Sequence, residues 1–291
     1  MHKYTGKTWS PSDIERIRAL IALSPQESRA ALAGQVCEVF AWRRPNGQLN
    51  LMASRLAMLR MHRDGLIELP APRHVHRRPS GEFSSVASDP EPLVETLLKD
   101  LPDLRVELVT RGKPLRLWNE FIARYHYLGY GVIPGAQLRY FIMAGERVLG
   151  AMGFGGAAWK VAPRDRFIGW TAVERQSRLH LVVNQTRFLI LPWVRCQNLA
   201  TKSLAMVKRR LPSDWQVRYG YEPVLLETFV DTRFRGTCYK AANWTEVGLT
   251  QGRSRMDRHH AKDQPVKSIW LMPLSSNFRT ALLGGLRTTV E

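Results

Sequence analysis

One stretch in the second half of the chain limits what the whole can fold into: a short apolar run that leads directly into an amphipathic helix. Residues 188–191, Phe-Leu-Ile-Leu, are continuously apolar and end at Pro192, as in a strand buried on both faces. From Ala200 onward, apolar residues recur at i, i+4, i+7 and i+11 on one face of a predicted helix, which we expect Pro212 to stop. The pattern predicts a strand–turn–helix unit inside a mixed α/β domain.

The turn within this unit is polar and carries Arg195, Gln197 and Asn198. Several backbone N–H groups are unpaired at the start of a helix, and the helix dipole is positive there, so this turn is a candidate anion site. An ordinary packing unit without a ligand has the same spacing. The pattern alone does not separate the two interpretations.

The charge balance points to a polyanionic partner. The 291 residues include 43 Lys and Arg against 25 Asp and Glu, which gives a formal net charge of +18. An excess of this size favours DNA or another nucleic acid as the partner, with a solvated basic surface as the alternative. Because 44% of the residues are hydrophobic, the chain can build a sizeable core and is not expected to be disordered.

Cysteine usage and the lack of long apolar runs indicate a cytoplasmic protein. Cys37, Cys196 and Cys238 lie far apart and without metal-site spacing, so reduced thiols are expected. No apolar run approaches the roughly 18 residues that a membrane-spanning helix needs. The first residues lack the apolar segment of a secretory signal.

Residues 1–78 are predicted to form a small helical domain. Helical periodicity covers residues 11–21, 29–40 and 49–64, and a short strand is expected at 66–70 after Gly65. This order is typical of a winged helix, in which the third helix enters the major groove of DNA. A three-helix module without DNA affinity is the alternative. A basic tail at 74–78 and basic residues on and before the third helix favour DNA binding, through Arg43, Arg44, Arg55, Arg60 and Arg63.

Residues 79–92 are rich in turn formers and lack an apolar period, so we interpret them as a linker. Residues 93–291 then form a second domain of mixed strands and helices. Its predicted order is a hairpin, the buried central strand, a helix, a strand that contains Glu227, a short helix and two last strands. The expected fold class is α+β: a winged-helix-like domain followed by a mixed α/β domain.

This order of elements resembles the fold of the GNAT acyltransferases. In that family the central strand and helix form the acyl-CoA site, and Arg195-x-x-Asn198-x-Ala200 stands where the family has Arg/Gln-x-x-Gly-x-Gly/Ala. The resemblance implies a donor site at Arg195, Gln197, Asn198 and Ala200. Asn198 replaces the glycine that lets backbone approach a pyrophosphate. The cofactor therefore stays open, with an acyl-CoA-like donor as one candidate.

Residues 117 to about 274 resemble more closely the family that contains DruA, a component of the Druantia anti-phage system. The shared motifs include His-Tyr-Leu-Gly at 126–129, Asn-Gln-Thr-Arg-Phe-Leu-Ile-Leu-Pro at 184–192, Leu-Glu-Thr-Phe-Val-Asp at 226–231 and Gly-Thr-Cys-Tyr-Lys-Ala-Ala-Asn-Trp at 236–244. The last of these also resembles the divergent GNAT-like group of the phage DNA-modification protein Mom. Members of the family that contains DruA occur with defence genes and with transposase-like genes. The resemblance thus implies a protein of a defence or mobile-element system and assigns no reaction.

Two carboxylates and a tyrosine are the candidate catalytic groups. Glu227 lies within an apolar strand and Asp231 at its end, where a lone carboxylate is costly, so each is ion-paired or functional. Arg187 or Arg195 is the expected partner in the first case. In the second, Glu227 or Asp231 is a general base that deprotonates an amine or a water. The GNAT resemblance implies that Tyr239 is a general acid. We expect the three to face one cleft beside the turn at 195–200, in a DNA-modifying transferase.

Further residues are candidate nucleic-acid contacts. His126 and Tyr127 are predicted to stack on a base or to position a substrate, with burial in the core as the alternative. Asn184 and Arg187 are predicted to hold a flipped base or a phosphate. A basic segment late in the chain is predicted to contact DNA backbone through Arg253, Arg255 and Arg258.

Two other classes of function remain open. A metal-dependent nuclease or transposase would use Asp165, Glu227 and Asp231 to hold divalent metal ions, which requires the three carboxylates to cluster. A non-catalytic adaptor would bind DNA and recruit other defence or transposition proteins. The sequence shows no tight metal-binding spacing.

Overall fold

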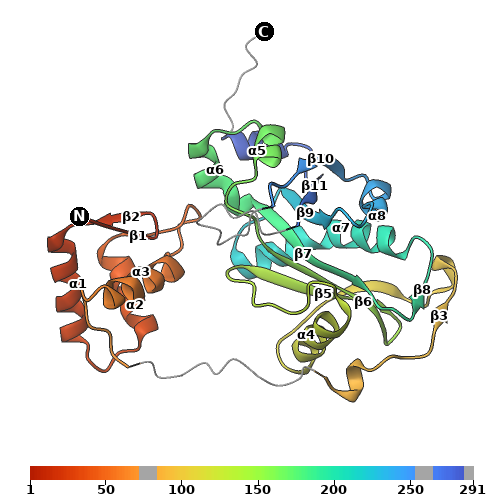
Figure 1. The fold of residues 1–291 in the computed structure, drawn as a ribbon, viewed down its shortest axis with the longest axis horizontal. Coiled ribbons are helices and arrows are strands. Elements are labelled where there is room, and N and C mark those ends of the chain that lie inside the picture. The colour runs from red at the N-terminus through yellow and green to blue at the C-terminus, as the bar shows by residue number, and fades with distance from the viewer. Residues whose placement is uncertain (72–83, 253–264, 285–291) are drawn as a thin grey trace, which may run out of the picture. The chain divides into compact units, whose positions relative to one another are not determined.

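The computed structural model describes residues 1–71, 84–252 and 265–284 of the chain. Contacts divide the chain into two compact units, Met1–Gly81 and Glu82–Glu291 (Figure 1). Each unit has a hydrophobic core of its own. The basic tail at 74–78, the linker residues 79–83 and the predicted contacts Arg253, Arg255 and Arg258 lie outside the described residues.

In the first unit, three helices and a short hairpin share one core. Strands β1 (His2–Tyr4) and β2 (Lys7–Trp9) pair around a two-residue turn, in which Thr5 and Gly6 both have positive φ. The predicted helices are present within two residues of their expected bounds, as α1 (Pro11–Leu23), α2 (Arg29–Val39) and α3 (Leu51–Arg63). A capping box between Ser10 and Asp13 fixes the start of α1.

The strand predicted at residues 66–70 is wrong. These residues have no partner strand in the described part of the chain. Arginine side chains donate hydrogen bonds to two of their carbonyl groups instead. Arg18 Nε donates to the Leu66 carbonyl at 2.8 Å, and Arg29 Nε donates to the Pro70 carbonyl at 2.6 Å. Ile67 and Leu69 are buried in the core of this unit. The winged-helix assignment therefore stays a prediction, without the strand on which its wing was based.

The second unit is built on a seven-stranded mixed sheet in the order β10-β11-β9-β7-β6-β5-β4. Only the central pair, β7 and β9, is parallel, and the other neighbours are antiparallel. The predicted hairpin, central strand and late strands are all present, which confirms a mixed α/β domain. The bounds are β4 Leu104–Leu108, β5 Gln137–Ala144, β6 Arg147–Gly156, β7 Val182–Ile190, β9 Leu225–Asp231, β10 Thr245–Leu249 and β11 Lys267–Pro273.

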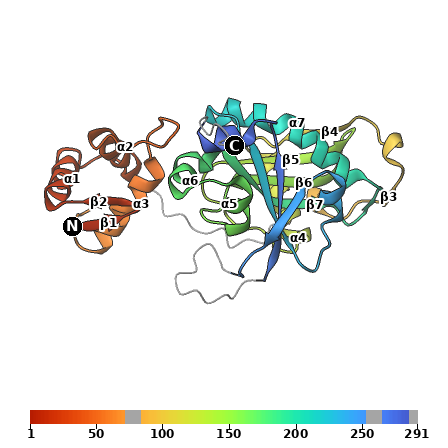
Figure 2. The same ribbon diagram turned by 90° about the horizontal axis from the view of Figure 1, so that it is seen from above.

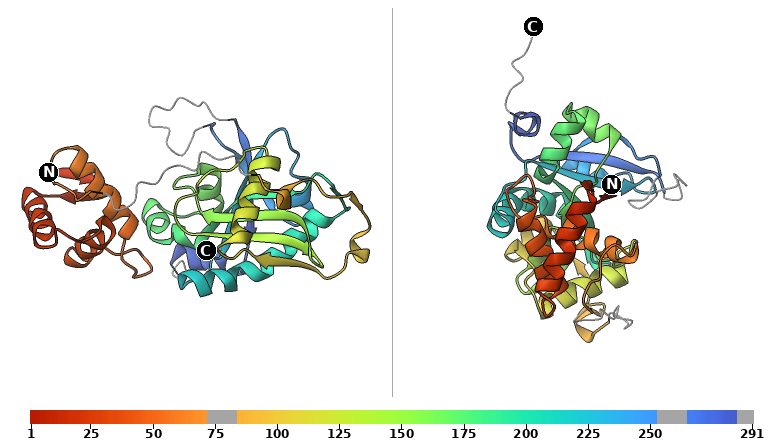
Figure 3. Two further views of the ribbon diagram at one scale, coloured as in Figure 1. Left: turned by 90° about the horizontal axis from the view of Figure 1, so that it is seen from below. Right: turned by 90° about the vertical axis from the view of Figure 1, so that its left-hand side faces the viewer.

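Two long helices cover opposite faces of the sheet (Figures 2 and 3). Helix α4 (Lys113–Tyr125) lies on one face, where Trp118 Nε1 donates to the Met152 carbonyl at 3.2 Å. Helix α7 (Leu199–Tyr219) lies on the other, where Asp214 accepts from the Tyr140 hydroxyl at 2.9 Å. The shorter elements are α5 Ala162–Ile168, α6 Ala172–Arg178, α8 Thr237–Ala241, α9 Phe278–Leu283 and the parallel pair β3 Val94–Glu95 and β8 Val194–Arg195.

Pro212 lies inside α7 and does not end the helix as predicted. The apolar stripe continues past it through Leu211 and Trp215, both of which are buried. Burial of a tryptophan outweighs the single backbone hydrogen bond that proline cannot donate. The helix ends at Gly220, which takes the left-handed conformation with φ 81°.

Residues 84–92, the second part of the predicted linker, are held on the second unit. Ser85 donates to the Glu120 carboxylate on α4, and Arg124 pairs with Asp89 at 2.7 Å. Arg147 on β6 pairs with Glu91 at 2.6 Å.

No helix in the described ranges is long and apolar enough to cross a membrane.

The parallel pair β7 and β9 separates part of the way along its length. Residues 182–185 pair with residues 225–228, and the pairing ends there. The register of β7 against β6 shifts at the same level, between Gly153 and Phe154. Beyond this point the last residues of β7 do not pair with the last residues of β9, as expected for neighbouring strands that splay apart.

Candidate functional site

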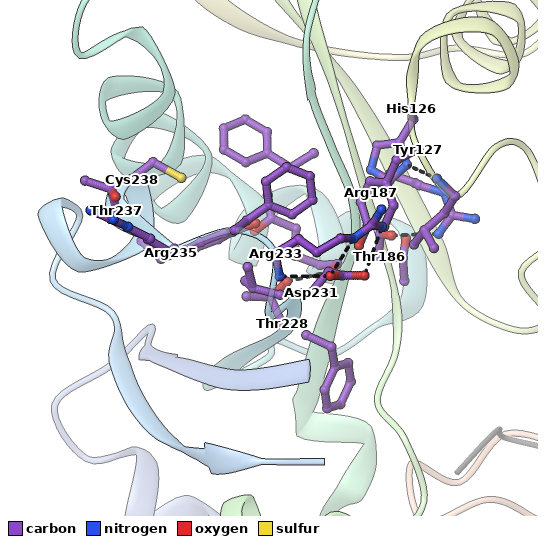
Figure 4. Close-up of a pocket in the computed structure, with 18 residues that line it drawn as sticks. His126, Tyr127, Thr186, Arg187, Thr228, Asp231, Arg233, Arg235, Thr237 and Cys238 are labelled. Atoms are coloured by element: carbon purple, nitrogen blue, oxygen red, sulfur yellow. Dashed lines mark hydrogen bonds and ion pairs between the residues drawn. The ribbon is translucent and has the colours of Figure 1, made fainter. Parts of the chain in front are cut away.

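A cleft of about 550 Å³ opens where β7 and β9 separate (Figure 4). Residues 185–188 of β7 and 228–231 of β9 form two of its walls. The loop after α4 contributes residues 126–128, and the segment that leads into α8 contributes residues 233–239. The cleft therefore draws together the ends of two central strands and two loops, where ligands commonly bind in such sheets.

Arg187 is a cation of this cleft that backbone carbonyl groups hold in place. Its Nε donates to the Gly129 carbonyl at 3.2 Å and its Nη1 to the Thr186 carbonyl at 2.7 Å. Among the described residues no carboxylate forms an ion pair with it. Burial lowers the pKa of this guanidinium, because the charged form loses hydration without gaining a counter-ion.

Asp231 is a carboxylate of the cleft wall, and a neighbouring arginine clamps it. Arg233 contacts both oxygens through Nε and Nη2, at 2.9 Å and 3.1 Å, and its backbone N–H also donates at 3.0 Å. These hydrogen bonds lower the pKa of Asp231 below its usual value. Lys267 on β11 is its register partner on the other side. Asp231 is therefore ionised at neutral pH.

Two exposed aromatic rings stand beside Arg233. The rings of Tyr127 and Phe234 are 5.4 Å apart, and the Arg233 guanidinium lies 5.6 Å and 5.9 Å from their respective centroids. Tyr127 is 46% exposed and Phe234 is 52% exposed, although both side chains are large and apolar. Exposed rings next to arginines form a stacking surface for flat groups.

His126 stacks on Tyr127 with ring centroids 4.9 Å apart. The Leu128 N–H donates to its Nδ1 at 3.2 Å, so the neutral ring carries its proton on Nε2. Burial, then the charges of Arg187 and Lys267, lower the pKa of His126 to about 4. The imidazole is therefore neutral at physiological pH.

Gln185 is the most deeply buried polar side chain of the cleft that has no partner. It is 3% exposed and lines the cleft, yet neither Oε1 nor Nε2 has a hydrogen-bond partner among the residues that the structure describes. Each such orphaned group costs a folded protein about 1–3 kcal/mol. The sequence analysis missed this residue, although it lies between the two predicted contacts Asn184 and Arg187.

Glu227 does not line the cleft, so the expectation that it faces Asp231 and Tyr239 is wrong. Glu227 and Asp231 lie on the same face of β9, but Glu227 belongs to the part of the strand that still pairs with β7, where Arg164 of α5 binds it. Arg164 Nη1 lies 2.8 Å from its Oε2, and the Ala158 N–H donates to its Oε1 at 2.9 Å. The partner is therefore Arg164, and neither Arg187 nor Arg195.

Tyr239 does line the cleft, on the side of α8. Its ring packs edge-on against Phe188 and Trp244, and burial raises the pKa of its hydroxyl. Tyr239 is thus a protonated hydroxyl group at the cleft wall.

The predicted donor turn lies outside the cleft. None of Arg195, Gln197, Asn198 and Ala200 is among the described residues that line it. Asn198 begins α7 in the left-handed conformation, with φ 65° and an exposed side chain. The Arg195 carbonyl accepts from the Thr96 N–H at 3.4 Å. Every residue from Arg195 to Ala200 carries a side chain, so the turn does not fit the close approach of the pyrophosphate of an acyl-CoA.

The remaining predicted residues are dispersed. Asn184 is the register partner of Glu227 and does not line the cleft. The three carboxylates of the nuclease alternative do not cluster, because Asp165 and Glu227 are both bound to Arg164 while Asp231 is bound to Arg233. In the described ranges no group of three His, Cys, Asp or Glu side chains is placed to hold a metal ion. Residues of the first unit belong to a separate body and do not line this cleft: Arg43, Arg44, Arg55, Arg60 and Arg63.

Sequence reasoning also missed the basic and aromatic segment that follows Asp231. Arg233, Phe234 and Arg235 all line the cleft and all are exposed. An aromatic residue between two arginines directly after a candidate catalytic carboxylate was the available signal. Of the residues that were predicted, the structure brings five together in this cleft: His126, Tyr127, Arg187, Asp231 and Tyr239.

Solved structures similar to this chain include several acyl- and acetyltransferases. The N-acyl amino acid synthase FeeM from uncultured soil microbes is 14% identical, over 60% of this chain and 91% of that chain, with a TM-score of 0.37. Spermidine N-acetyltransferase from Vibrio cholerae is 12% identical, over 59% and 95% of the two chains, with a TM-score of 0.36. The mosquito arylalkylamine N-acetyltransferase like 5b is 12% identical, over 58% and 99%, with a TM-score of 0.35. Similarities of this size say nothing about the activity of this chain.

No curated protein matches the chain. One family does match, over residues 60–262, which is more than half of the 291 residues. Its description is Druantia protein DruA. The matched range includes all of the residues that line the cleft, from His126 to Tyr239. The chain therefore belongs to the DruA family.

Proposed function

We propose that this protein is a nucleic-acid-binding component of an anti-phage defence or mobile-element system, and that the cleft between β7 and β9 holds part of its DNA ligand. Membership of the DruA family supports the biological setting. The net charge of +18 supports a polyanionic ligand. The cleft adds the chemistry that such a ligand requires.

The observation that carries this proposal is the charge of Arg187. A part-buried guanidinium without a carboxylate partner is unfavourable unless an anion completes the site. Both of its hydrogen bonds go to backbone carbonyl groups, so its charge remains available. Arg233 and Arg235 stand in the same cleft, against the single carboxylate Asp231. The cleft therefore has an excess of positive charge suited to phosphate groups.

The aromatic rings of the cleft favour a nucleic acid over a simple anion. Tyr127 and Phe234 are exposed beside Arg233, and stacking on aromatic rings is how proteins bind unpaired bases. A sulfate-like or carboxylate ligand would not use these surfaces. A strand with flat bases and charged phosphates uses both.

The experiment is a binding titration with the variant Arg187→Ala and a matched control, Arg209→Ala. Arg209 lies exposed on α7, outside the residues that line the cleft, so its removal changes the net charge equally. We expect Arg187→Ala to weaken binding of a single-stranded oligonucleotide by about tenfold, which is the loss of one charged hydrogen-bonded contact. We expect Arg209→Ala to change binding by less than about twofold, as for a screened surface charge.

Equal effects of the two variants would mean that charge alone attracts the ligand and that the cleft does not hold it. Loss of the thermal transition in Arg187→Ala would instead indicate a structural role. In that case Arg187→Lys keeps the charge and tests the site again. A folded Arg187→Lys variant that retains binding would support the proposal, and a folded one that binds no better than charge-independent background would contradict it.

Proton transfer is the chemistry that the cleft offers, and we propose it as a second step. Asp231 is ionised and Tyr239 is protonated, which are the states of a base and an acid, but both pKa shifts weaken these groups in those roles, so the step requires that the ligand change the surroundings of Asp231. Arg233 is mostly exposed, so a phosphate group of the ligand can draw its guanidinium away from Asp231, which raises the pKa of the carboxylate and makes it a stronger base. Mass spectrometry of DNA after incubation with cell extract and protein tests this step. Unchanged DNA together with retained binding would leave the adaptor alternative.

We also propose that the first unit contributes duplex binding through its basic face. Arg55 and Arg63 are exposed on α3, and Arg43 lies exposed in the loop that precedes it. Cationic side chains on and near one helix are the electrostatic footprint of DNA binding. A variant in which all three are alanine is expected to lose duplex affinity while single-strand binding at the cleft is retained.

A further inference from the structure

Gln185 lines the cleft, and both polar atoms of its side chain are buried without a partner among the described residues. It lies on β7 at the last position that pairs with β9, opposite Thr228. Its backbone carbonyl is satisfied by the Thr228 hydroxyl at 3.1 Å, but both terminal atoms of its side chain lack partners. Because both atoms are free, the conclusion is the same whichever of them is the oxygen.

A buried amide of this kind has one complement. It presents a donor and an acceptor side by side, so it pairs with a group that offers an acceptor and a donor at the same spacing. The hydrogen-bonding edge of a nucleobase has this pattern, and glutamine amides bind adenine in this way in duplex DNA. Enzymes that act on a base take it out of the stack and bind the same edge inside a pocket.

We propose that Gln185 binds the edge of one unpaired nucleobase, which enters the cleft past the exposed rings of Tyr127 and Phe234. This inference rests on the proposed function and names the part of the nucleic acid that the cleft holds. The deep position of Gln185 separates the roles: the amide binds the base, while Arg187, Arg233 and Arg235 bind phosphate groups next to it. The residue therefore makes binding depend on a base and not only on charge.

The test uses a ten-nucleotide strand that is abasic at every position, and a second strand with one central adenine. The full-length protein is expected to bind the one-base strand about tenfold more tightly than the abasic strand, since a bidentate amide–base pair discriminates by roughly this factor. Gln185→Met keeps the length and unbranched shape of the side chain and removes both polar atoms. We expect Gln185→Met to bind the two strands equally, at the affinity of the wild type for the abasic strand.

The matched control is Gln216→Met, on the exposed face of α7. It should retain the tenfold preference for the strand with a base. Thermal melting should change in the opposite direction to binding. Because the amide has no partner, the Gln185→Met variant should have a melting temperature equal to or higher than that of the wild type. A clearly lower melting temperature would overturn the proposal by showing that the amide is paired in the folded protein.

Two results would separate this inference from the proposed function. If the wild type binds neither strand at low salt, the proposed function is wrong. If it binds both strands equally, nucleic-acid binding stands and the role of Gln185 is overturned. Competition by adenosine monophosphate identifies the source of the base: full displacement at micromolar concentration means a free nucleotide, and lack of displacement means a base within a strand. Cytosine, guanine and thymine in place of the central adenine then show which edge the amide prefers.

Discussion

Arg164 and Glu227 form an ion pair in which neither side chain has any solvent exposure. The pair joins helix α5 to the central strand β9, and Arg164 also donates to the Ala158 carbonyl. Its second carboxylate partner, Asp165, is held in turn by Arg175. Glu227 is thus one end of a buried network that attaches the segment after β6 to the sheet. Of the two carboxylates that the sequence offers as a base, Glu227 is therefore a structural ion-pair partner.

We expect Glu227→Gln to destabilise the protein by about 3 kcal/mol, because removal of one partner leaves a buried guanidinium short of a counter-charge. Denaturant unfolding measures this directly. The control is Glu222→Gln, an exposed carboxylate near the start of the same strand, which should change stability by less than about 0.5 kcal/mol. The double variant Arg164→Met with Glu227→Leu should recover part of the loss. Unchanged stability with lost activity would make Glu227 a functional group after all.

The stability of the second unit should fall in mild acid because of His126. The pKa of the folded imidazole is about 4, below its ordinary value, so the unfolded chain takes up a proton at a higher pH than the folded protein. Stability is therefore fully present above pH 6.5 and declines as pH falls toward 4. At pH 5 the loss from this residue is at most about 2 kcal/mol, at about 1.4 kcal/mol per pH unit.

The variant His126→Asn removes this titration while its side-chain oxygen can still accept from the Leu128 N–H. The difference in unfolding free energy between pH 7 and pH 5 should therefore be smaller in the variant. Arg187 and Lys267, the cations that contribute to the shift, should not change their charge over this range. An equal pH dependence in both proteins would show that His126 is solvated in the folded state.

Local patterns in the sequence predicted those parts of the fold that local interactions determine. The start of α1 at Pro11, the hairpin β5–β6 and the strand β9 all follow from caps, turns and apolar periods, and all are confirmed. The stop at Pro212 was wrong because tertiary burial of Trp215 overrides the local cost of proline. The strand at 66–70 was wrong because a strand needs a partner, which no local pattern supplies.

The cleft was only partly predictable, because its residues come from strands that separate. Asp231 and Tyr239 were found from their chemistry and position, and His126, Tyr127 and Arg187 from their motifs. The partner of Glu227 depends on where α5 packs along β9, and α5 was not predicted. Gln185 gave no signal, because an amide is informative only when its burial and lack of partners are known.

Removal of the first unit should leave the second one folded and less strongly bound to duplex DNA. The two units have separate hydrophobic cores, so a protein that begins at residue 82 should keep a cooperative melt. Its affinity for duplex should depend less steeply on salt, since each lost phosphate contact changes the log–log slope by about 0.9. Fluorescence anisotropy over a salt series measures both. An unchanged slope would mean that the first unit does not contact DNA, and a lost melt would mean that the two units are one domain.

The variant Asp231→Asn separates binding from chemistry at the cleft. The change removes the carboxylate that holds Arg233, so the guanidinium becomes free to pair with a phosphate group. We therefore expect tighter binding of a single strand and a salt slope that is steeper by about one contact. Any modification of DNA should be lost at the same time, because an amide cannot accept the proton that the carboxylate takes. Glu222→Gln adds the same net charge away from the cleft and should alter neither property. Weaker binding by Asp231→Asn would instead indicate that the carboxylate itself binds the ligand, either directly at a hydrogen-bond donor of the ligand or through a bound cation. The proposed division of roles between Asp231 and the arginines would then be wrong.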